Sequence, residues 1–291
     1  MKITLRMQTP LWTGGVDGKS TRLHETGLIG SIRWWYEVIV RGLGGSACDP
    51  TGDRSCPDKE GKRCAACQLF GCTSWQRKFK LRILDEDDNL FTEKPDAEYG
   101  FPAKTSMTWH FLELRPLEEE ERWLLMQAIN IASKYGAIGG RTTLKPQGNK
   151  RVGGDYGLFE ITNRVGEVKL AASRVRSWLN HDRFRKVPNH GWPDLRGFFF
   201  VSGQCLWRKQ INALLGLSAD GDPVNHGKLE VALRGQVGVS KKVFSFDTPS
   251  ARRLWGYVPT PQLRKQAIQR LQELGIEASN IRTGEEVLDE L

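Results

Sequence analysis

The sequence has no long apolar segment. None of its apolar runs approaches the roughly 18 consecutive residues of a membrane-spanning helix, and the mean hydropathy of the 291 residues is −0.46. The first seven residues alternate polar and apolar side chains, carry charges at Lys2 and Arg6, and lack the apolar core of a secretory signal. These absences predict a soluble, cytoplasmic protein without a membrane partner.

Familiar catalytic motifs are also missing. No HExxH, GxSxG, Walker or dinucleotide-binding motif occurs, and the five histidines are scattered along the chain. The acidic run from Asp85 to Asp88 is explained as a solvated turn between two strands. His24 could act as a general base, but a lone loop histidine supports this role weakly. The sequence therefore argues against a free-standing enzyme.

The charge balance is positive. Lysine and arginine total 43 residues against 34 aspartates and glutamates, which gives a formal net charge of +9 and a pI near 9.3. A basic protein favours an anionic partner, and nucleic acid, an anionic membrane or a phosphorylated ligand would each satisfy this condition. The positions of the charges have to decide between these partners.

Apolar periodicity predicts the elements of the first half of the chain. They are a strand at 2–7, a helix at 27–43, strands at 81–83 and 107–114, a helix at 123–135 and a strand at 156–161. The order strand, helix, strand, strand, helix, strand is typical of the ferredoxin-like α+β fold.

The second half has a weaker pattern. Helices are predicted at 168–179, 210–217 and 261–274, and strands at 198–201, 228–239 and 242–246. We expect a ferredoxin-like domain at residues 1–162, with a cysteine-rich insertion at 44–72. A second, degenerate α+β half at 163–291 is expected to pack on it as one rigid body.

Five of the six cysteines lie between Cys48 and Cys72. In a reducing compartment such clustering favours a metal site over disulfides. Cys64 and Cys67 form a CxxC pair, and Cys48 and Cys56 would complete four thiolates around a structural zinc ion, which would hold together a loop too polar to fold by packing. Because the spacing matches no standard zinc motif, three alternatives stay open: Cys72 replaces one ligand, two cysteines form a redox pair, or all are free thiols.

A glycine-rich, basic segment spans residues 135–156. Its six glycines can expose backbone N–H groups, and its basic residues are Arg141, Lys145, Lys150 and Arg151. Both features suit phosphate binding. The alternative interpretation is a flexible hairpin without a ligand.

The first predicted helix carries an arginine followed by three aromatic residues. Trp35 and Tyr36 are interpreted as core residues. If the helix proper starts at Gly30-Ser31, Arg33 lies in its first turn, where a positive charge opposes the helix dipole. We then expect a phosphate or carboxylate partner for it, unless it is a solvated surface residue. Arg41 follows two turns later.

Four short motifs resemble, in their order, the RAMP superfamily of CRISPR effector proteins, and in particular the first Cmr subunit of type III-B complexes. They are Thr9-Pro10-Leu11-Trp12-Thr13-Gly14-Gly15, Gly30-Ser31-Ile32-Arg33-Trp34-Trp35, Gln68-Leu69-Phe70-Gly71 and Gly139-Gly140-Arg141. The resemblance covers residues 1–160 well and extends more loosely to Lys241-Lys242 and to the segment after Trp255.

The resemblance implies a ferredoxin-like RAMP fold with a zinc-binding insertion. It also implies a non-catalytic subunit that binds crRNA near its 3′ end and helps to engage target RNA, beside other type III effector subunits, in antiviral defence. A RAMP endoribonuclease that uses His24 or a lysine near the glycine-rich segment is the alternative. The residues expected to bind RNA are Arg33, Arg41, Gly139, Gly140, Arg141, Lys145, Lys150, Arg151, Lys241 and Lys242.

Two departures from the family pattern concern the predicted sites. The glycine-rich loop is stretched from Gly139 to Gly154, and Cys72 follows the Leu-Phe-Gly turn where a serine is common. They leave the geometry of the loop and the choice of the fourth zinc ligand open.

Overall fold

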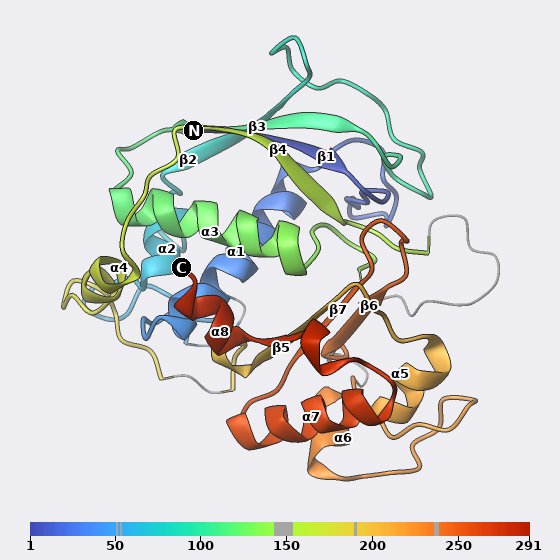
Figure 1. Cartoon of the computed structure of the whole chain (residues 1–291). Coiled ribbons are helices and arrows are strands. Elements are labelled where there is room, and N and C mark those ends of the chain that lie inside the picture. Colours follow the sequence, from blue (N-terminus) through green and yellow to red (C-terminus); the bar gives the residue numbers. More distant parts are fainter. Residues whose placement is uncertain (51, 53, 143–153, 189–190, 236–238) are drawn as a thin grey trace.

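The protein contains two four-stranded antiparallel sheets with helices packed against them (Figure 1). The computed structural model describes residues 1–50, 52, 54–142, 154–188, 191–235 and 239–291. The α+β class predicted from the sequence is confirmed. No helix in these ranges is both long and apolar enough to cross a bilayer.

The first unit follows the predicted order of elements. These are β1 (Lys2–Met7), α1 (Glu25–Gly42), α2 (Ala65–Phe70), β2 (Phe79–Leu84), β3 (Ser106–Glu113), α3 (Glu119–Tyr135) and β4 (Phe159–Val165). The strands lie in the order β2-β3-β1-β4, and every neighbouring pair is antiparallel. This is the ferredoxin-like arrangement, so the fold predicted for the first half is confirmed.

The second half repeats this topology. After α4 (Ala172–Leu179) and a 3-10 turn (Leu195–Gly197) come β5 (Phe198–Ser202), α5 (Arg208–Leu214), α6 (Lys228–Leu233), β6 (Val243–Phe246), β7 (Arg253–Tyr257), α7 (Pro261–Glu273), β8 (Ile281–Thr283) and α8 (Gly284–Asp289). The strand order β6-β7-β5-β8 matches β2-β3-β1-β4 position by position. The half predicted to be degenerate is thus a second ferredoxin-like unit, while the domain boundary at residue 162 stays a prediction.

One predicted strand is wrong. The segment Lys228–Leu233 is a helix, although its apolar residues Leu229, Val231 and Leu233 alternate as in a strand. Leu229 and Leu233 are buried, whereas Val231 is 58% exposed. Residues four apart share one face of a helix, so two buried leucines satisfy the helical period and Val231 is a surface residue.

Helices α1 and α3 lie between the two sheets, and α5, α6 and α7 lie beyond the second sheet (Figure 1). Phe198, Phe200 and Trp255 of the second sheet belong to the same apolar core as α1 and α3. Phe199 and Leu254, whose side chains point to the other face, belong to a separate core with α5, α6 and α7. The two units therefore share one core through their middle layer.

Candidate functional site

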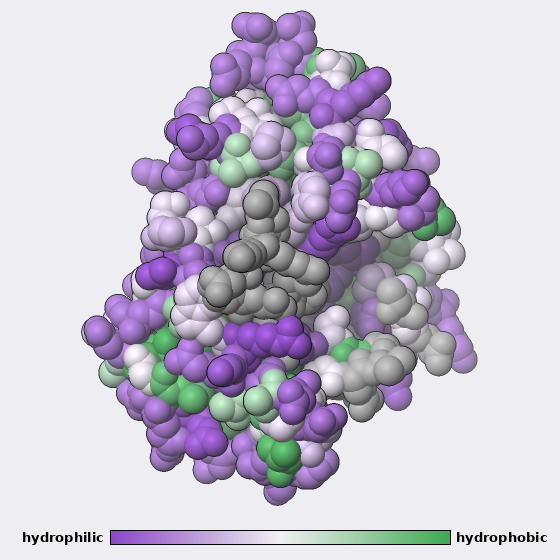
Figure 2. Space-filling view, turned by 90° about the vertical axis from the view of Figure 1, so that its right-hand side faces the viewer, coloured by the Kyte–Doolittle hydropathy of each residue, from purple (hydrophilic) through white to green (hydrophobic). Residues whose placement is uncertain are grey.

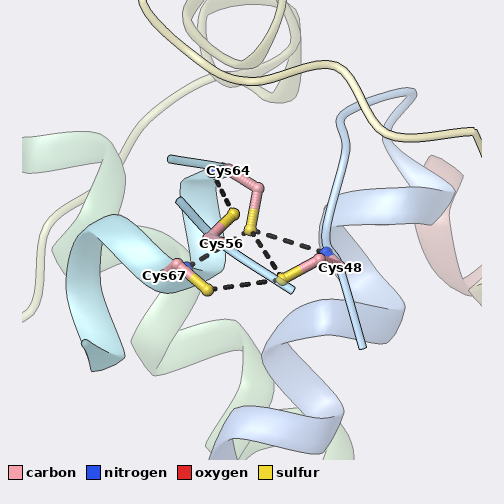
Figure 3. A group of neighbouring side chains, drawn as sticks. All are labelled: Cys48, Cys56, Cys64 and Cys67. Atoms are coloured by element: carbon pink, nitrogen blue, oxygen red, sulfur yellow. Dashed lines mark hydrogen bonds between the residues drawn. The ribbon is translucent and has the colours of Figure 1, made fainter. Parts of the chain in front are cut away.

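The four cysteines predicted as metal ligands converge on one point (Figure 3). Cys48, Cys56, Cys64 and Cys67 are buried, and their sulfur atoms all lie within 4.8 Å of one another. Cys48 Sγ is 3.4 Å from Cys67 Sγ and 3.8 Å from Cys64 Sγ. Four thiolates at about 2.3 Å from a tetrahedral zinc ion are about 3.8 Å apart. The donor set and its spacing therefore fit a metal ion such as zinc.

Local chain geometry brings the ligands together. Cys64 is the N-cap of α2, where its Sγ accepts a hydrogen bond from Cys67 N at 3.5 Å. The cap holds the two cysteines of the CxxC pair on one turn. Cys64 N donates in turn to Cys56 Sγ at 3.3 Å, and Cys48 N donates to Cys64 Sγ at 3.5 Å. These N–H donors stabilise negative charge on sulfur.

Two arginines also reach the cysteine cluster. Arg33 Nη2 lies 3.2 Å from Cys67 Sγ, and Arg185 Nη1 lies 3.7 Å from Cys56 Sγ. Four thiolates around a divalent cation carry a net charge of −2, which two guanidinium groups offset. Sequence reasoning missed Arg185, because nothing in its neighbourhood distinguishes it from other surface arginines.

The sulfur atoms of the cluster are hydrogen-bonded to one another. A hydrogen bond with Cys48 lowers the pKa of Cys56, whereas a hydrogen bond with Cys48 raises the pKa of Cys67. Cys72, the alternative ligand, does not belong to the group of four close sulfurs, and its Sγ contacts Thr73 O at 3.7 Å. The fold thus brings together the four cysteines predicted from the sequence, and their binding of a metal stays a prediction.

Arg33 has three partners within the protein. Besides Cys67 it donates to Glu37 Oε1 at 2.8 Å and to Gly71 O at 3.0 Å. Burial opposes ionisation, but Glu37 and Cys67 together raise the pKa of Arg33, so it stays charged. Of the two partners expected for this residue, the structure shows a carboxylate; an RNA contact stays a prediction. Arg33 thereby joins α1 to the Leu-Phe-Gly turn.

Arg41 is also engaged inside the fold. It is 5% exposed, and it donates to Ala47 O at 3.1 Å, to Pro193 O at 2.9 Å and to Glu37 Oε2 at 3.4 Å. Glu37 thus lies between two arginines of the same helix. The predicted contact of Arg41 with RNA is untested. Its side chain binds the main-chain oxygens of Ala47, in the insertion, and of Pro193.

The first and last sequence motifs meet around Trp12. A Cβ atom on Gly14 would lie 2.1 Å from the Trp12 ring, and one on Gly140 would lie 2.4 Å from it. Gly140 N donates to Trp12 O at 2.8 Å. Both glycines are required because the indole lies directly against their Cα atoms.

Arg141 covers the same indole. Its guanidinium lies 4.8 Å from the Trp12 ring centroid and 5.7 Å from that of Tyr156, and its Nη1 donates to Glu98 O at 2.5 Å. The helix motif joins this group too, since Gly139 N donates to Ser31 Oγ at 3.0 Å. Two motifs near the start of the chain and a third more than a hundred residues later therefore form one cluster, the Trp12 cluster: Trp12, Gly14, Ser31, Gly139, Gly140 and Arg141.

The comparisons with known proteins agree with these motifs. The model of the RAMP superfamily matches residues 4–144. The matched segment contains all four motifs and is just under half of the chain, 141 of its 291 residues. No curated protein sequence matches it.

Two solved chains are similar to this chain. One comes from a cryo-EM structure of the Type III-B Cmr-beta bound to cognate target RNA; it is 9% identical, with 94% of this chain and 98% of that chain covered and a TM-score of 0.50. The other comes from Cmr-beta bound to cognate target RNA and AMPPnP in the presence of ssDNA, with 10% identity, 94% and 99% coverage and a TM-score of 0.49. The first likeness shows a shared fold over nearly the whole of both chains.

The remaining residues expected to bind RNA are distributed around the fold. Lys145, Lys150 and Arg151 lie outside the described residues. Lys241 Nζ donates to Val243 O at 2.5 Å, and Lys242 lines a pocket beside β7. In the described residues, the side of the molecule presented by Figure 2 is mostly hydrophilic, with small separate apolar patches.

The weak catalytic candidates have local roles. His24 is the N-cap of α1, its main-chain N–H donates to Thr13 Oγ1 at 3.0 Å, and its buried Nε2 has no partner among the described residues. Asp85 Oδ1 accepts hydrogen bonds from Asp87 N at 3.0 Å and Asn89 N at 2.9 Å. The acidic run is thus the turn that the sequence predicts.

Proposed function

We propose that this RAMP protein is a non-catalytic, cytoplasmic RNA-binding subunit of a type III-B CRISPR effector complex. In this proposal it binds crRNA near its 3′ end and helps to engage target RNA beside other effector subunits. The observation that carries the proposal is the Trp12 cluster, which presents Arg141 at the start of a basic glycine-rich segment. The fold shared with a chain of the Cmr-beta complex bound to cognate target RNA supports it.

Arg141 is suited to a phosphate. Its ring contacts and its single bond to a main-chain oxygen fix the guanidinium, and no carboxylate among the described residues pairs with it. A positioned arginine with unused donors can bind a phosphate oxygen with two N–H groups. Because phosphates carry no sequence information, binding at this cluster would depend little on RNA sequence.

We further infer that the four cysteines hold a structural zinc ion. Four thiolates leave no open coordination position for a water molecule, so the ion would stabilise the insertion and would not act as a Lewis acid. The ion would be held by Cys48, Cys56, Cys64 and Cys67, while Arg33 and Arg185 offset its negative ligand charge.

A non-catalytic role is favoured by the state of His24. A general base needs a partner that orients it and a position next to the proton that it removes. The Nε2 atom of His24 is buried, so in this structure it does not lie where an RNA hydroxyl group could reach it.

The test is the salt dependence of RNA binding. For single strands, the logarithm of the affinity falls with the logarithm of salt concentration by about 0.7 per phosphate contact. We expect Arg141→Gln to reduce this slope by about 0.7 and to weaken binding of unrelated RNA sequences equally. Arg270→Gln, which removes a charge from α7, should leave the slope unchanged. RNA recovered from the assay without metal should be intact.

Two results would contradict the proposal. If Arg141→Gln and Arg270→Gln give the same slope as the unmodified protein, the Trp12 cluster does not contact phosphates. Discrete RNA fragments that vanish in His24→Ala would instead identify an endoribonuclease.

A further inference from the structure

A pocket of about 360 Å³ lies between the segment that precedes β5 and the start of α7. It is separate from the cysteine cluster and from the Trp12 cluster. Its volume is near the lower end of the range for small-molecule sites, which is about 300 to 1,000 Å³. The residues that give it chemical character are Trp192, Asp194, Arg196, Lys242, Tyr257 and Glu285.

The walls of the pocket are held rigidly. The backbone of Gly197 packs against Val258, which directly follows β7. Val258 N donates to Gly197 O at 3.1 Å, and a Cβ atom on Gly197 would lie 2.3 Å from Val258 O. The Tyr257 ring stacks on Phe198 with 5.0 Å between the centroids. A pocket built from close backbone contacts and stacked rings keeps its shape before a ligand binds, which lowers the entropic cost of binding.

The carboxylates of the pocket are neutralised by arginines. Asp194 Oδ2 accepts from Arg196 Nη2 at 2.6 Å, and Glu285 Oε2 accepts from Arg264 Nη2 at 2.6 Å. Lys242 Nζ, in contrast, has no hydrogen bond or ion pair among the described residues. The pocket therefore presents one uncompensated positive charge, which favours an anionic ligand.

The same pocket offers aromatic surface and a hydroxyl group. Trp192 lies beneath the Arg41 guanidinium at 5.3 Å, and the Lys242 ammonium is 6.0 Å from the Tyr257 ring centroid. Burial raises the pKa of Tyr257 to about 12, so its hydroxyl stays protonated at neutral pH. Two aromatic side chains, a hydroxyl and one lysine match a planar base, a ribose and a phosphate.

We propose that this pocket binds a single ribonucleotide, with its phosphate on Lys242 and its base against Trp192 and Tyr257. The inference deepens the proposed RNA-binding function and rests on it, since an RNA strand is the expected source of the nucleotide. A free nucleoside monophosphate has the same chemistry and is the second source. The pocket is too small for a duplex, so it selects one unstacked nucleotide.

The experiment uses the full chain with zinc bound. Adenosine and uridine 5′-monophosphates test the pocket directly, and eight-nucleotide RNAs with 4-thiouridine at one end or in the middle test a strand. We expect Lys242→Gln to weaken mononucleotide binding about tenfold, as for the loss of one charge-assisted hydrogen bond. Tyr257→Phe should weaken it less, and Lys209→Gln, on the surface of α5, should leave it unchanged.

Photo-crosslinks identify the source. Crosslinks from the terminal 4-thiouridine to Trp192 or Tyr257 indicate a strand end, and crosslinks from the central one indicate an internal nucleotide. Mononucleotide binding without crosslinks from either RNA indicates a free nucleotide.

The outcomes separate this inference from the proposed function. If neither mononucleotide binds at millimolar concentration and no crosslink maps to the pocket, the inference is wrong. In that case a salt slope that still depends on Arg141 leaves RNA binding standing. If mononucleotide binding depends on Lys242 but the protein does not bind RNAs longer than one nucleotide, the pocket binds nucleotides and the proposed RNA-binding function is wrong. Thermal unfolding of each variant shows whether a loss of binding reflects a loss of folding.

Discussion

The two ferredoxin-like units share a strand order but bury their sheets differently. In the first sheet, the face opposite α1 and α3 is open, and Arg6, Lys80 and Arg82 are exposed on it. In the second sheet, all of β6 and all of β5 except Ser202 are buried. The same topology thus gives one sheet covered on a single face and one covered on both.

One face of the second sheet is covered by a helix of the first unit. Trp34 and Trp35 of α1 contact Trp255 of β7, with centroids 5.8 and 5.2 Å apart. Helix α1 therefore packs against both sheets, and the sequence of α1 has to satisfy two partners. The second unit relies on helices of the first, and the cysteine insertion is attached to that shared layer through Arg33 and Arg41.

The largest expected effect concerns the metal. Cys64→Ser with Cys67→Ser should abolish zinc binding, and structural zinc sites contribute on the order of 10 kcal/mol in small peptides. Because Arg33 joins the cluster to α1, we expect both units to lose stability in one urea transition. Elemental analysis and unfolding followed by tryptophan fluorescence measure the two effects, with Cys205→Ser as the control.

Two results would contradict these expectations for the zinc ligands and for the coupling of the two units. Full zinc content in the double variant would refute the ligand assignment. Two separate unfolding transitions would show that the units are independent despite their shared core.

Much of this organisation is encoded locally and could be predicted. The strands and helices of the first unit have clear apolar periods, and the CxxC spacing predicts two ligands on one turn. The segment of α2 could not be predicted, because this short helix depends on the Cys64 cap and on burial of Leu69 and Phe70 in the main core. The insertion is thus partly apolar, contrary to the expectation of a loop too polar to pack.

Contacts between distant segments could not be predicted. Arg33 finds Cys67 and Gly71 more than thirty residues away, so its partners depend on the whole fold. Strand β8 was missed because it has three residues, all of intermediate burial, and thus lacks a period. Burial of Arg41, which is predicted to bind RNA, could not be foreseen because periodicity does not reveal that both sides of α1 are covered.

A second prediction compares buried cations in the two units. In the first, Lys78 Nζ lies 2.8 Å from Glu121 Oε2, and the Glu121 side chain is fully buried. In the second, the Arg253 side chain donates to Ser133 O and Gly136 O and has no carboxylate partner among the described residues. Burial lowers the pKa of Arg253 to about 10.

Lys78→Met should destabilise the protein by about 3 to 5 kcal/mol, because it leaves Glu121 as an unpaired buried charge. Arg253→Met leaves only neutral carbonyl groups unpaired, so a smaller loss of about 1 to 3 kcal/mol is expected. Urea unfolding at pH 7 measures both values. Equal losses would mean that the two buried cations are equivalent, and a Lys78→Met, Glu121→Met variant close to the unmodified protein would support the unpaired-charge explanation.

The smallest expected effect concerns the junction between the units. Asp155, just before β4, accepts hydrogen bonds through Oδ2 from Asp247 N at 2.7 Å and Thr248 Oγ1 at 2.8 Å, in the turn after β6. Burial raises the pKa of Asp155, although these two hydrogen bonds oppose the change. The folded protein therefore binds this proton more tightly than the unfolded chain does.

The raised pKa of Asp155 sets how the stability of the protein changes with pH. At pH values between the pKa of Asp155 in the unfolded chain and its higher pKa in the folded protein, the folded protein holds more protons. The free energy of unfolding therefore falls as pH rises through this range and recovers as pH falls. Asn at position 155 keeps an oxygen that can accept both hydrogen bonds but binds no proton. We expect Asp155→Asn to be the more stable protein at pH 7, with an advantage that shrinks toward pH 4. Because acid also releases metal from thiolates, the measured quantity is the difference between variant and unmodified protein at each pH, with the exposed Asp220→Asn as the control. A difference that does not vary with pH would show that Asp155 joins the two units by hydrogen bonding alone.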